Sequence, residues 1–316
     1  MDGVIGYIVS VVVIPAALAA FVGGLALATP LRRRAWVVDA GIAIALPIAF
    51  VASFVSELGS VALLRKFMVV EGDDAPFERW HWLGIACAAL IALGFATTFA
   101  RSQVARGGER FVDLASLLVA AVAAGIFVQF PQPSIASQIG IAGLVLAAGS
   151  AVALAGGALL WISWGAFGIL AALAGIGGFA SLAVMAGAVS VASFVLAILA
   201  AIGGKSIKDA KPVESAGAPL VVVASMLALV ARCGDAYDQS KTPDWIWWLV
   251  PLVPGFALLF MRQSLRAPSI AAATFWRTLG AALVGVAVLG AAIAMDASKA
   301  SGSDDEDDPY ADMYGG

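Results

Sequence analysis

Few side chains in this chain of 316 residues have the chemistry for catalysis or for holding a cofactor. His81 is the only histidine, which excludes a haem held by two histidines and a histidine-rich zinc site within the chain. No Gly-x-Ser-x-Gly motif accompanies it, and no phosphate-binding or dinucleotide-binding glycine motif is present. Cys87 and Cys233 are expected to be free, packed thiols, although their predicted depth would allow a disulfide. The sequence therefore predicts a non-enzyme with no cofactor, metal or nucleic-acid partner.

Acidic side chains are the more numerous candidates, and many of them gather outside the apolar segments. One group forms a predicted outer acidic rim, made of Glu71, Asp73, Asp74, Glu78, His81, Asp235 and Asp238. Carboxylates can bind Ca²⁺ or Mg²⁺, but none of these spacings matches an EF-hand loop. We therefore expect the rim to be solvated and free of metal.

A second acidic group lies at the C-terminal end of the chain. Residues 297–316 combine dense negative charge with few apolar side chains, so this tail is expected to be disordered on its own. Tyr310 and Tyr314 interrupt the acidic run close to Asp307 and Asp308. Such a segment can become ordered on a partner, so these four residues are predicted as a docking site for another protein.

Charged residues are missing from the middles of the apolar segments. Asp39 and Asp113 lie about one turn inside two of them. We expect each to pair with an arginine nearby in sequence, Asp39 with Arg33 or Arg34 and Asp113 with Arg110. Charge deep in a bilayer is costly and is retained for function, so its absence argues against a proton relay across the membrane.

Prolines interrupt one of the apolar segments. Pro251 and Pro254 stand three residues apart, followed by Gly255. Each proline removes a backbone donor and clashes with the preceding turn, which predicts a kinked or broken helix. Broken helices expose backbone carbonyls to solutes in many transporters, although membrane helices also tolerate proline without such a role.

The composition places all these residues in a membrane protein. The chain is 62% hydrophobic and 12% charged, with a mean hydropathy of +0.98, whereas soluble domains carry roughly 25% charged residues. A membrane-crossing helix needs about 20 apolar residues, which predicts an all-α polytopic bundle of about ten spans. The predicted spans are residues 4–28, 36–56, 82–100, 111–130, 139–155, 158–176, 179–202, 219–231, 245–261 and 278–295.

The stretch from residue 139 to residue 204 is the hardest to divide because it contains no charge. Glycine pairs at 156–157, 177–178 and 203–204 allow the chain to reverse, so we place three spans there. Two spans and a re-entrant segment are the alternative. The whole bundle is predicted to cover residues 1–296, with an interfacial loop at 57–81 on its outer side.

The orientation follows from the basic residues. Twelve of the 18 lie in loops on one side of the predicted bundle, and these loops are expected to be cytoplasmic. They are Arg32, Arg33, Arg34, Arg101, Arg106, Arg110, Lys205, Lys208, Lys211, Arg262, Arg266 and Arg277. Both termini would then be outside. The absence of asparagine and the abundance of alanine favour a GC-rich bacterial genome, and hence the bacterial cytoplasmic membrane.

Two functions fit these expectations. The first is a non-enzymatic scaffold or accessory subunit of a membrane assembly, in contact with lipid and with a protein partner through the C-terminal tail. The second is a secondary transporter of a neutral or apolar small solute. Ten spans divide into two five-helix halves, and an odd number of spans in each would make the halves inverted.

Overall fold

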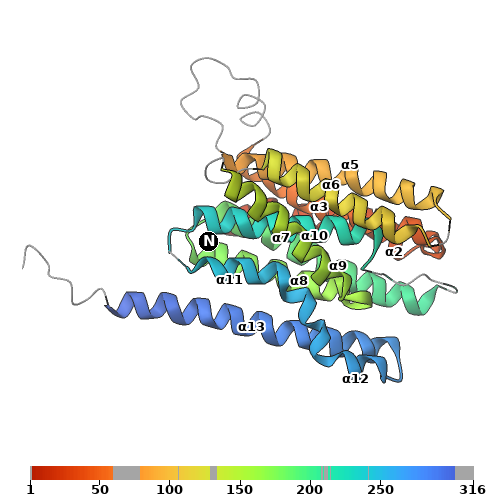
Figure 1. The fold of residues 1–316 in the computed structure, drawn as a ribbon. Coiled ribbons are helices and arrows are strands. Elements are labelled where there is room, and N and C mark those ends of the chain that lie inside the picture. Colours follow the sequence, from red (N-terminus) through yellow and green to blue (C-terminus); the bar gives the residue numbers. More distant parts are fainter. Residues whose placement is uncertain are drawn as a thin grey trace, which may run out of the picture.

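The chain folds into a bundle of membrane-spanning helices (Figure 1). The computed structural model describes residues 2–59, 79–105, 107–128, 134–207, 209, 213, 215–240 and 242–302. Within these ranges ten helices are long and apolar enough to cross a membrane, which confirms the predicted all-α polytopic fold.

The elements follow one another with few long connections, and their bounds are as follows. They are α1 (Asp2–Ile8), η1 (Val9–Val13), α2 (Ile14–Leu27), η2 (Pro30–Arg33), α3 (Ala35–Leu58), η3 (Arg79–His81), α5 (Trp82–Gln103), α6 (Glu109–Phe127), α7 (Ile135–Ala153), η4 (Gly156–Ala158), α8 (Leu159–Ile176), α9 (Ala180–Ser206), α10 (Gly217–Tyr237), α11 (Asp244–Leu249), η5 (Val250–Phe260), α12 (Met261–Leu265) and α13 (Ile270–Gly302). Here η1 is a π-helical segment, and the other η elements are 3₁₀ helices.

The uncharged stretch forms three spans, as predicted, and the alternative with a re-entrant segment is wrong. The spans are α7, the pair η4 and α8, and α9. The chain reverses at Gly156 and Gly178, whose φ angles of +55° and +76° lie in the left-handed region that favours glycine. The sharp reversals therefore fall at two of the three glycine pairs that the sequence offers.

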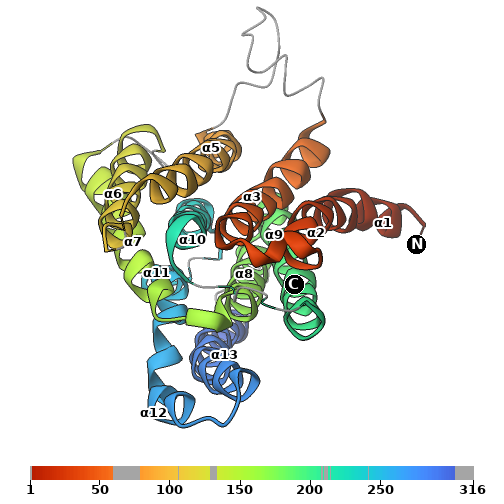
Figure 2. The same cartoon turned by 90° about the vertical axis from the view of Figure 1, so that its right-hand side faces the viewer.

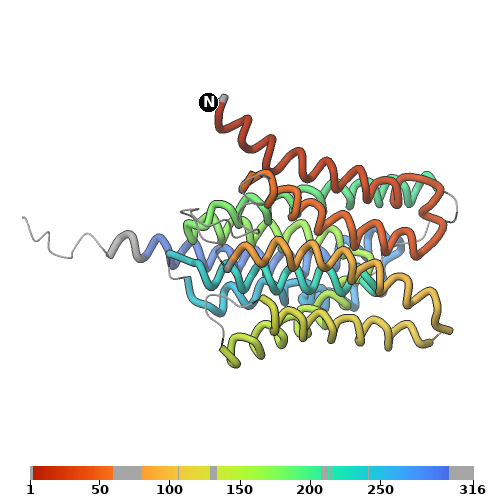
Figure 3. The backbone as a smooth tube through the Cα atoms, turned by 90° about the horizontal axis from the view of Figure 1, so that it is seen from above, coloured from red at the N-terminus to blue at the C-terminus, as the bar shows by residue number. Residues whose placement is uncertain are grey.

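Helix α10 lies in the middle of the bundle (Figure 2). It packs against α3, α5, α6, α7 and α8, and every residue from Gly217 to Ala231 is buried. Helices α1 and α13 lie at the periphery, and Figure 3 shows α1 diverging from its neighbours toward the N terminus. The core of the protein is thus assembled around the eighth span.

The two sets of five spans differ in their internal contacts. Helix α3 packs closely along α5, whereas the equivalent pair in the second set, α9 and α10, makes few contacts. The neighbours of equivalent helices are therefore not the same in the two sets.

Helix α13 is longer at both ends than the sequence predicted. It begins at Ile270 rather than at residue 278, and it continues to Gly302, past the predicted start of the tail at 297. Arg277 does not end the span because its side chain turns back into the protein and bonds Ser264 and Ala155. We call the end of the bundle with Arg32, Arg101 and Arg277 the arginine end, and the end with Asp235 and Asp238 the aspartate end.

Candidate functional site

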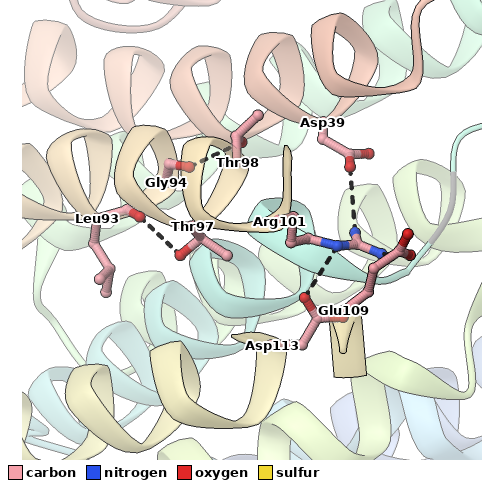
Figure 4. Close-up of polar contacts among 8 residues, drawn as sticks. All are labelled: Asp39, Leu93, Gly94, Thr97, Thr98, Arg101, Glu109 and Asp113. Atoms are coloured by element: carbon pink, nitrogen blue, oxygen red, sulfur yellow. Dashed lines mark hydrogen bonds and ion pairs between the residues drawn. The ribbon is translucent and has the colours of Figure 1, made fainter. Parts of the chain in front are cut away.

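A cluster of charged side chains lies at the arginine end and joins three helices (Figure 4). Arg101, near the end of α5, forms ion pairs with Asp39 of α3 at 3.3 Å and with Glu109 of α6 at 3.0 Å. Its Nε lies 3.4 Å from Oδ1 of Asp113, one turn further along α6. One guanidinium therefore holds three carboxylates, and the four side chains carry a formal charge of −2.

The partners in this cluster correct the sequence prediction. Asp113 was expected to pair with Arg110, but its ion pair joins it to Arg101. Asp39, which was expected to pair with Arg33 or Arg34, also forms an ion pair with Arg101. Proximity in sequence did not predict Arg101 as the shared partner, because α3, α5 and α6 bring their ends together at one depth. The side chains of Arg101, Asp39 and Asp113 are between 13% and 17% exposed, so little water screens them.

The start of α10, the central helix, is the fourth helical segment that contacts this cluster. Gly217 begins α10 with a φ of +65°, and a Cβ added there would lie 2.2 Å from Nη1 of Arg101. In α5 itself, Thr97 and Thr98 donate to the carbonyls of Leu93 and Gly94, so their hydroxyls are satisfied within the helix (Figure 4). The arrangement fixes α3, α5, α6 and α10 to one another.

Two further arginines at the same end donate to backbone carbonyls of neighbouring segments. Nη1 of Arg32, a buried residue, donates to the carbonyls of Leu27 and Ala200 near the ends of α2 and α9. Nη1 of Arg277 donates to the carbonyl of Ala155, between α7 and α8. Leu27 is the last residue of α2, where the carbonyls of a helix lack intrahelical donors and carry partial negative charge, so the guanidinium of Arg32 stabilises this helix end.

Each of these arginines lies against a glycine of another segment. An added Cβ would lie 2.9 Å from Nη1 of Arg32 at Gly203 and 1.6 Å from Nη1 of Arg277 at Gly156. Together with Gly217 against Arg101, these contacts form a repeated arginine–glycine arrangement. Because a guanidinium is planar and glycine has no side chain, each charge fits between helices without separating them.

The predicted broken helix is present as η5, an eleven-residue 3₁₀ helix. Runs of 3₁₀ helix longer than 3–4 residues are uncommon. With three residues per turn, Pro251, Pro254 and Ala257 share one face, and all three are buried. Gly255 lies on another face, where it lines an apolar hollow of about 330 Å³ between η5 and α7. The three predicted site residues thus face different surroundings.

At the aspartate end, Asp235 and Asp238 have partners inside the protein. Asp235 bonds Arg232 and accepts from the indole of Trp248 at 3.1 Å. Asp238 accepts from the indole of Trp247 at 3.2 Å and from the backbone N–H groups of Ser240 and Thr242. These aspartates fasten the end of α10 to the start of α11 rather than forming an open carboxylate surface.

Asp238 gives the aspartate end a dependence on pH. Burial disfavours its charged form, but hydrogen bonds from Ser240, Trp247 and Thr242 outweigh burial and lower the pKa of Asp238 below its usual value. A carboxyl with a lowered folded-state pKa stabilises the fold above its unfolded pKa, about 3.9, and this contribution disappears as the pH falls through the folded pKa.

Asp238→Asn is therefore expected to lower the melting temperature at neutral pH, and the difference from the native protein should shrink as the pH falls below about 4. Thermal unfolding in detergent between pH 3 and pH 7 measures this difference. A gap that stays constant down to pH 3 would contradict the assignment.

His81 and the cysteines complete the described candidates. His81 is buried, and its ring lies 4.2 Å from that of Trp80 and 6.2 Å from that of Phe54. Cys87 and Cys233 are free and buried, as predicted. Among the described residues no group of three or more His, Cys, Asp and Glu side chains could hold a metal ion.

The remaining predicted sites lie outside the described residues. They are Glu71, Asp73, Asp74 and Glu78 of the rim and Asp307, Asp308, Tyr310 and Tyr314 of the docking tail. The chain matches none of the protein families, curated proteins or solved structures with which it was compared.

Proposed function

We propose that this multi-pass membrane protein is a non-enzymatic scaffold or accessory subunit of a membrane assembly. The observation that carries the proposal is the length of α13 and its extension beyond the bundle. Thirty-three residues correspond to about 50 Å at 1.5 Å per residue, whereas the hydrocarbon of a bilayer is about 30 Å thick. In Figure 1 this helix continues past the ends of the other spans.

The extension supports a role in presenting the acidic tail. Among the side chains of α13 whose burial is described, up to residue 298, Ala292 is the last buried one, and those from Asp296 to Ser298 are exposed. The residues beyond Ala292 add about 15 Å of helix, to which residues 303–316 are attached. A rigid helical spacer that ends in a charged segment with two tyrosines suits capture of a protein partner in front of the membrane.

The proposed setting is the bacterial cytoplasmic membrane. We infer that the arginine end faces the cytoplasm, because basic loops are retained there. The ten spans bring the start of α1 and the end of α13 to the aspartate end, which would then face the periplasm. The burial of the central helix, in contact with α3, α5, α6, α7 and α8, supports a bundle that acts as a fixed framework.

The proposal predicts a tail-dependent complex. Mild detergent extraction followed by native gel electrophoresis should give a species larger than the 32.1 kDa chain, and truncation after Gly302 should convert it to the free protein. As a full-length control, the aspartates and the glutamate of residues 303–316 are changed to asparagine and glutamine. This variant keeps the length of the tail and tests whether its negative charge is needed for the complex. Migration of the native chain only as a free monomer would contradict the scaffold function.

The alternative function, transport of a neutral or apolar solute, is supported by η5. Its two buried prolines have no N–H to donate to the preceding turn, and such interruptions expose backbone carbonyls in the broken helices of transporters. A transporter would open this face to water from each side in turn.

Under this alternative, Ala257→Cys should react with a membrane-impermeant maleimide added on either side. When Pro251→Ala and Pro254→Ala are added to the Ala257→Cys variant, the reaction with maleimide should be abolished, because the two substitutions restore an α-helix. Leu170→Cys, deep in α8, is the matched control that stays unreactive. No reaction at residue 257 from either side would remove the alternative.

A further inference from the structure

A cavity of about 350 Å³ opens between α5, α6 and α10, away from the charged cluster and from η5. Its volume is within the range of roughly 300–1,000 Å³ found for small-molecule sites. Its walls are apolar, with Leu90 and Leu93 from α5, Ala120 and Ala124 from α6, and Leu229 from α10. No ionisable side chain is among the described residues that line it, so the cavity favours a neutral, apolar molecule.

One polar atom in this cavity has no partner. Ser225 of the central helix lines the cavity, is 1% exposed, and its Oγ has no hydrogen-bond partner. Two other buried serines are satisfied: Ser190 donates to the carbonyl of Trp164, and Ser193 to that of Val189. A buried hydroxyl without a partner is destabilising, so a ligand that supplies the partner gains affinity from it.

The depth of Ser225 restricts the ligand further. Eight residues separate it from the start of α10 and twelve from the end, which places it about 12 Å and 18 Å from the two ends of the helix. Trp82, at the start of α5 and 43% exposed, lies at the aspartate end of the same cavity. The cavity therefore runs from the membrane interface to near the middle of the bilayer.

We propose that this cavity binds a neutral, lipid-soluble molecule that carries a carbonyl or hydroxyl oxygen at its buried end, and that Ser225 donates a hydrogen bond to this oxygen. An ordinary phospholipid chain entering from the interface would bring only its terminal methyl group to Ser225. A long-chain ketone, or a ring bearing a carbonyl on an apolar chain, brings the matching acceptor to the required depth. The site is independent of the scaffold function, because it uses neither α13 nor the tail.

The test uses two photoreactive probes of equal length, a long-chain ketone and the alkane that lacks the oxygen, added to the full chain in lipid nanodiscs. The ketone should label α5, α6 and α10 more strongly than the alkane does. Ser225→Ala should weaken labelling by the ketone about 3- to 10-fold, to the level of the alkane. Ser163→Ala is the matched control, because Ser163 is also buried without a partner but does not line the cavity.

A second pair of variants tests the cavity itself. Ala123→Phe places a ring inside it and should abolish labelling by both probes, whereas Ala115→Phe on the same helix lies outside the lining and should leave labelling unchanged. Unchanged melting temperatures show that these variants fold. Equal labelling of the native protein by both probes would overturn the proposal, since ordinary acyl chains would then fill the cavity. Ketone labelling that is insensitive to Ser225→Ala would overturn it as well.

Discussion

Arg101→Gln is expected to lower the free energy of unfolding by about 3 kcal/mol, one of the two largest effects of a single substitution that we predict. The change removes the guanidinium that holds Asp39, Glu109 and Asp113, and it leaves their negative charges at the packed ends of α3 and α6. Breaking a buried ion pair by removing one partner costs roughly 3–5 kcal/mol. We expect a loss at the lower end of this range, because the side chain of Glu109 is 48% exposed and water screens its charge. Titration with SDS in mixed micelles measures the loss.

A second substitution separates the charge from the packing. If uncompensated carboxylates cause the loss, Asp113→Asn should recover part of the stability in the Arg101→Gln background and should reduce it in the native one. Arg110→Gln is the control, because no ion pair of Asp113 with Arg110 is found. Equal effects of Arg101→Gln and Arg110→Gln would contradict the central position given to Arg101.

Gly203→Ala is expected to destabilise the bundle by a similar amount, about 3 kcal/mol, at the upper end of the cost of overpacking. The added methyl carbon would lie 2.2 Å from the carbonyl oxygen of Leu27 and 2.9 Å from Nη1 of Arg32. The first of these atoms is backbone, so α2 and α9 would have to move apart and would loosen the bonds that Arg32 makes to both helices. The melting temperature in detergent reports this loss.

The same helix supplies a matched control. An added Cβ at Gly187 meets no heavy atom within 4 Å, so Gly187→Ala should be neutral or should stabilise α9 by about 0.5–1 kcal/mol. Destabilisation by both changes would point to a general intolerance of α9 to alanine. Destabilisation by Gly203→Ala alone would locate the effect at the contact with α2.

The number of spans and the places where they break could be predicted from sequence, because both depend on local properties. A hydrocarbon layer of fixed thickness sets the length of a crossing helix, and glycine pairs permit reversal. A glycine inside a span does not by itself predict a close contact between helices. Gly41 and Gly149 do make close contacts, with Ala26 and Leu117, but an added Cβ at Gly143 or Gly290 would meet nothing within 4 Å.

The partners of the charged residues could not be predicted, because they depend on which helices become neighbours. The sequence places Arg101, Asp39 and Asp113 at similar depths but does not say that α3, α5 and α6 meet there. One available signal is depth itself: residues near the ends of different spans on one side are all potential partners. The same reasoning applies to Asp235 and Asp238, whose indole donors come from the following span.

The central place of α10 has a consequence for how the protein is made. Spans enter the bilayer in the order of synthesis, at about 5–20 residues per second, so the ribosome needs roughly 10–50 s to reach the end of α10 near residue 237. Until then the seven earlier spans lack the helix around which several of them pack. We therefore expect a late committed step in biogenesis, at which the helices already inserted rearrange around α10. Nascent chains that stall before this step are the expected substrates of membrane quality control.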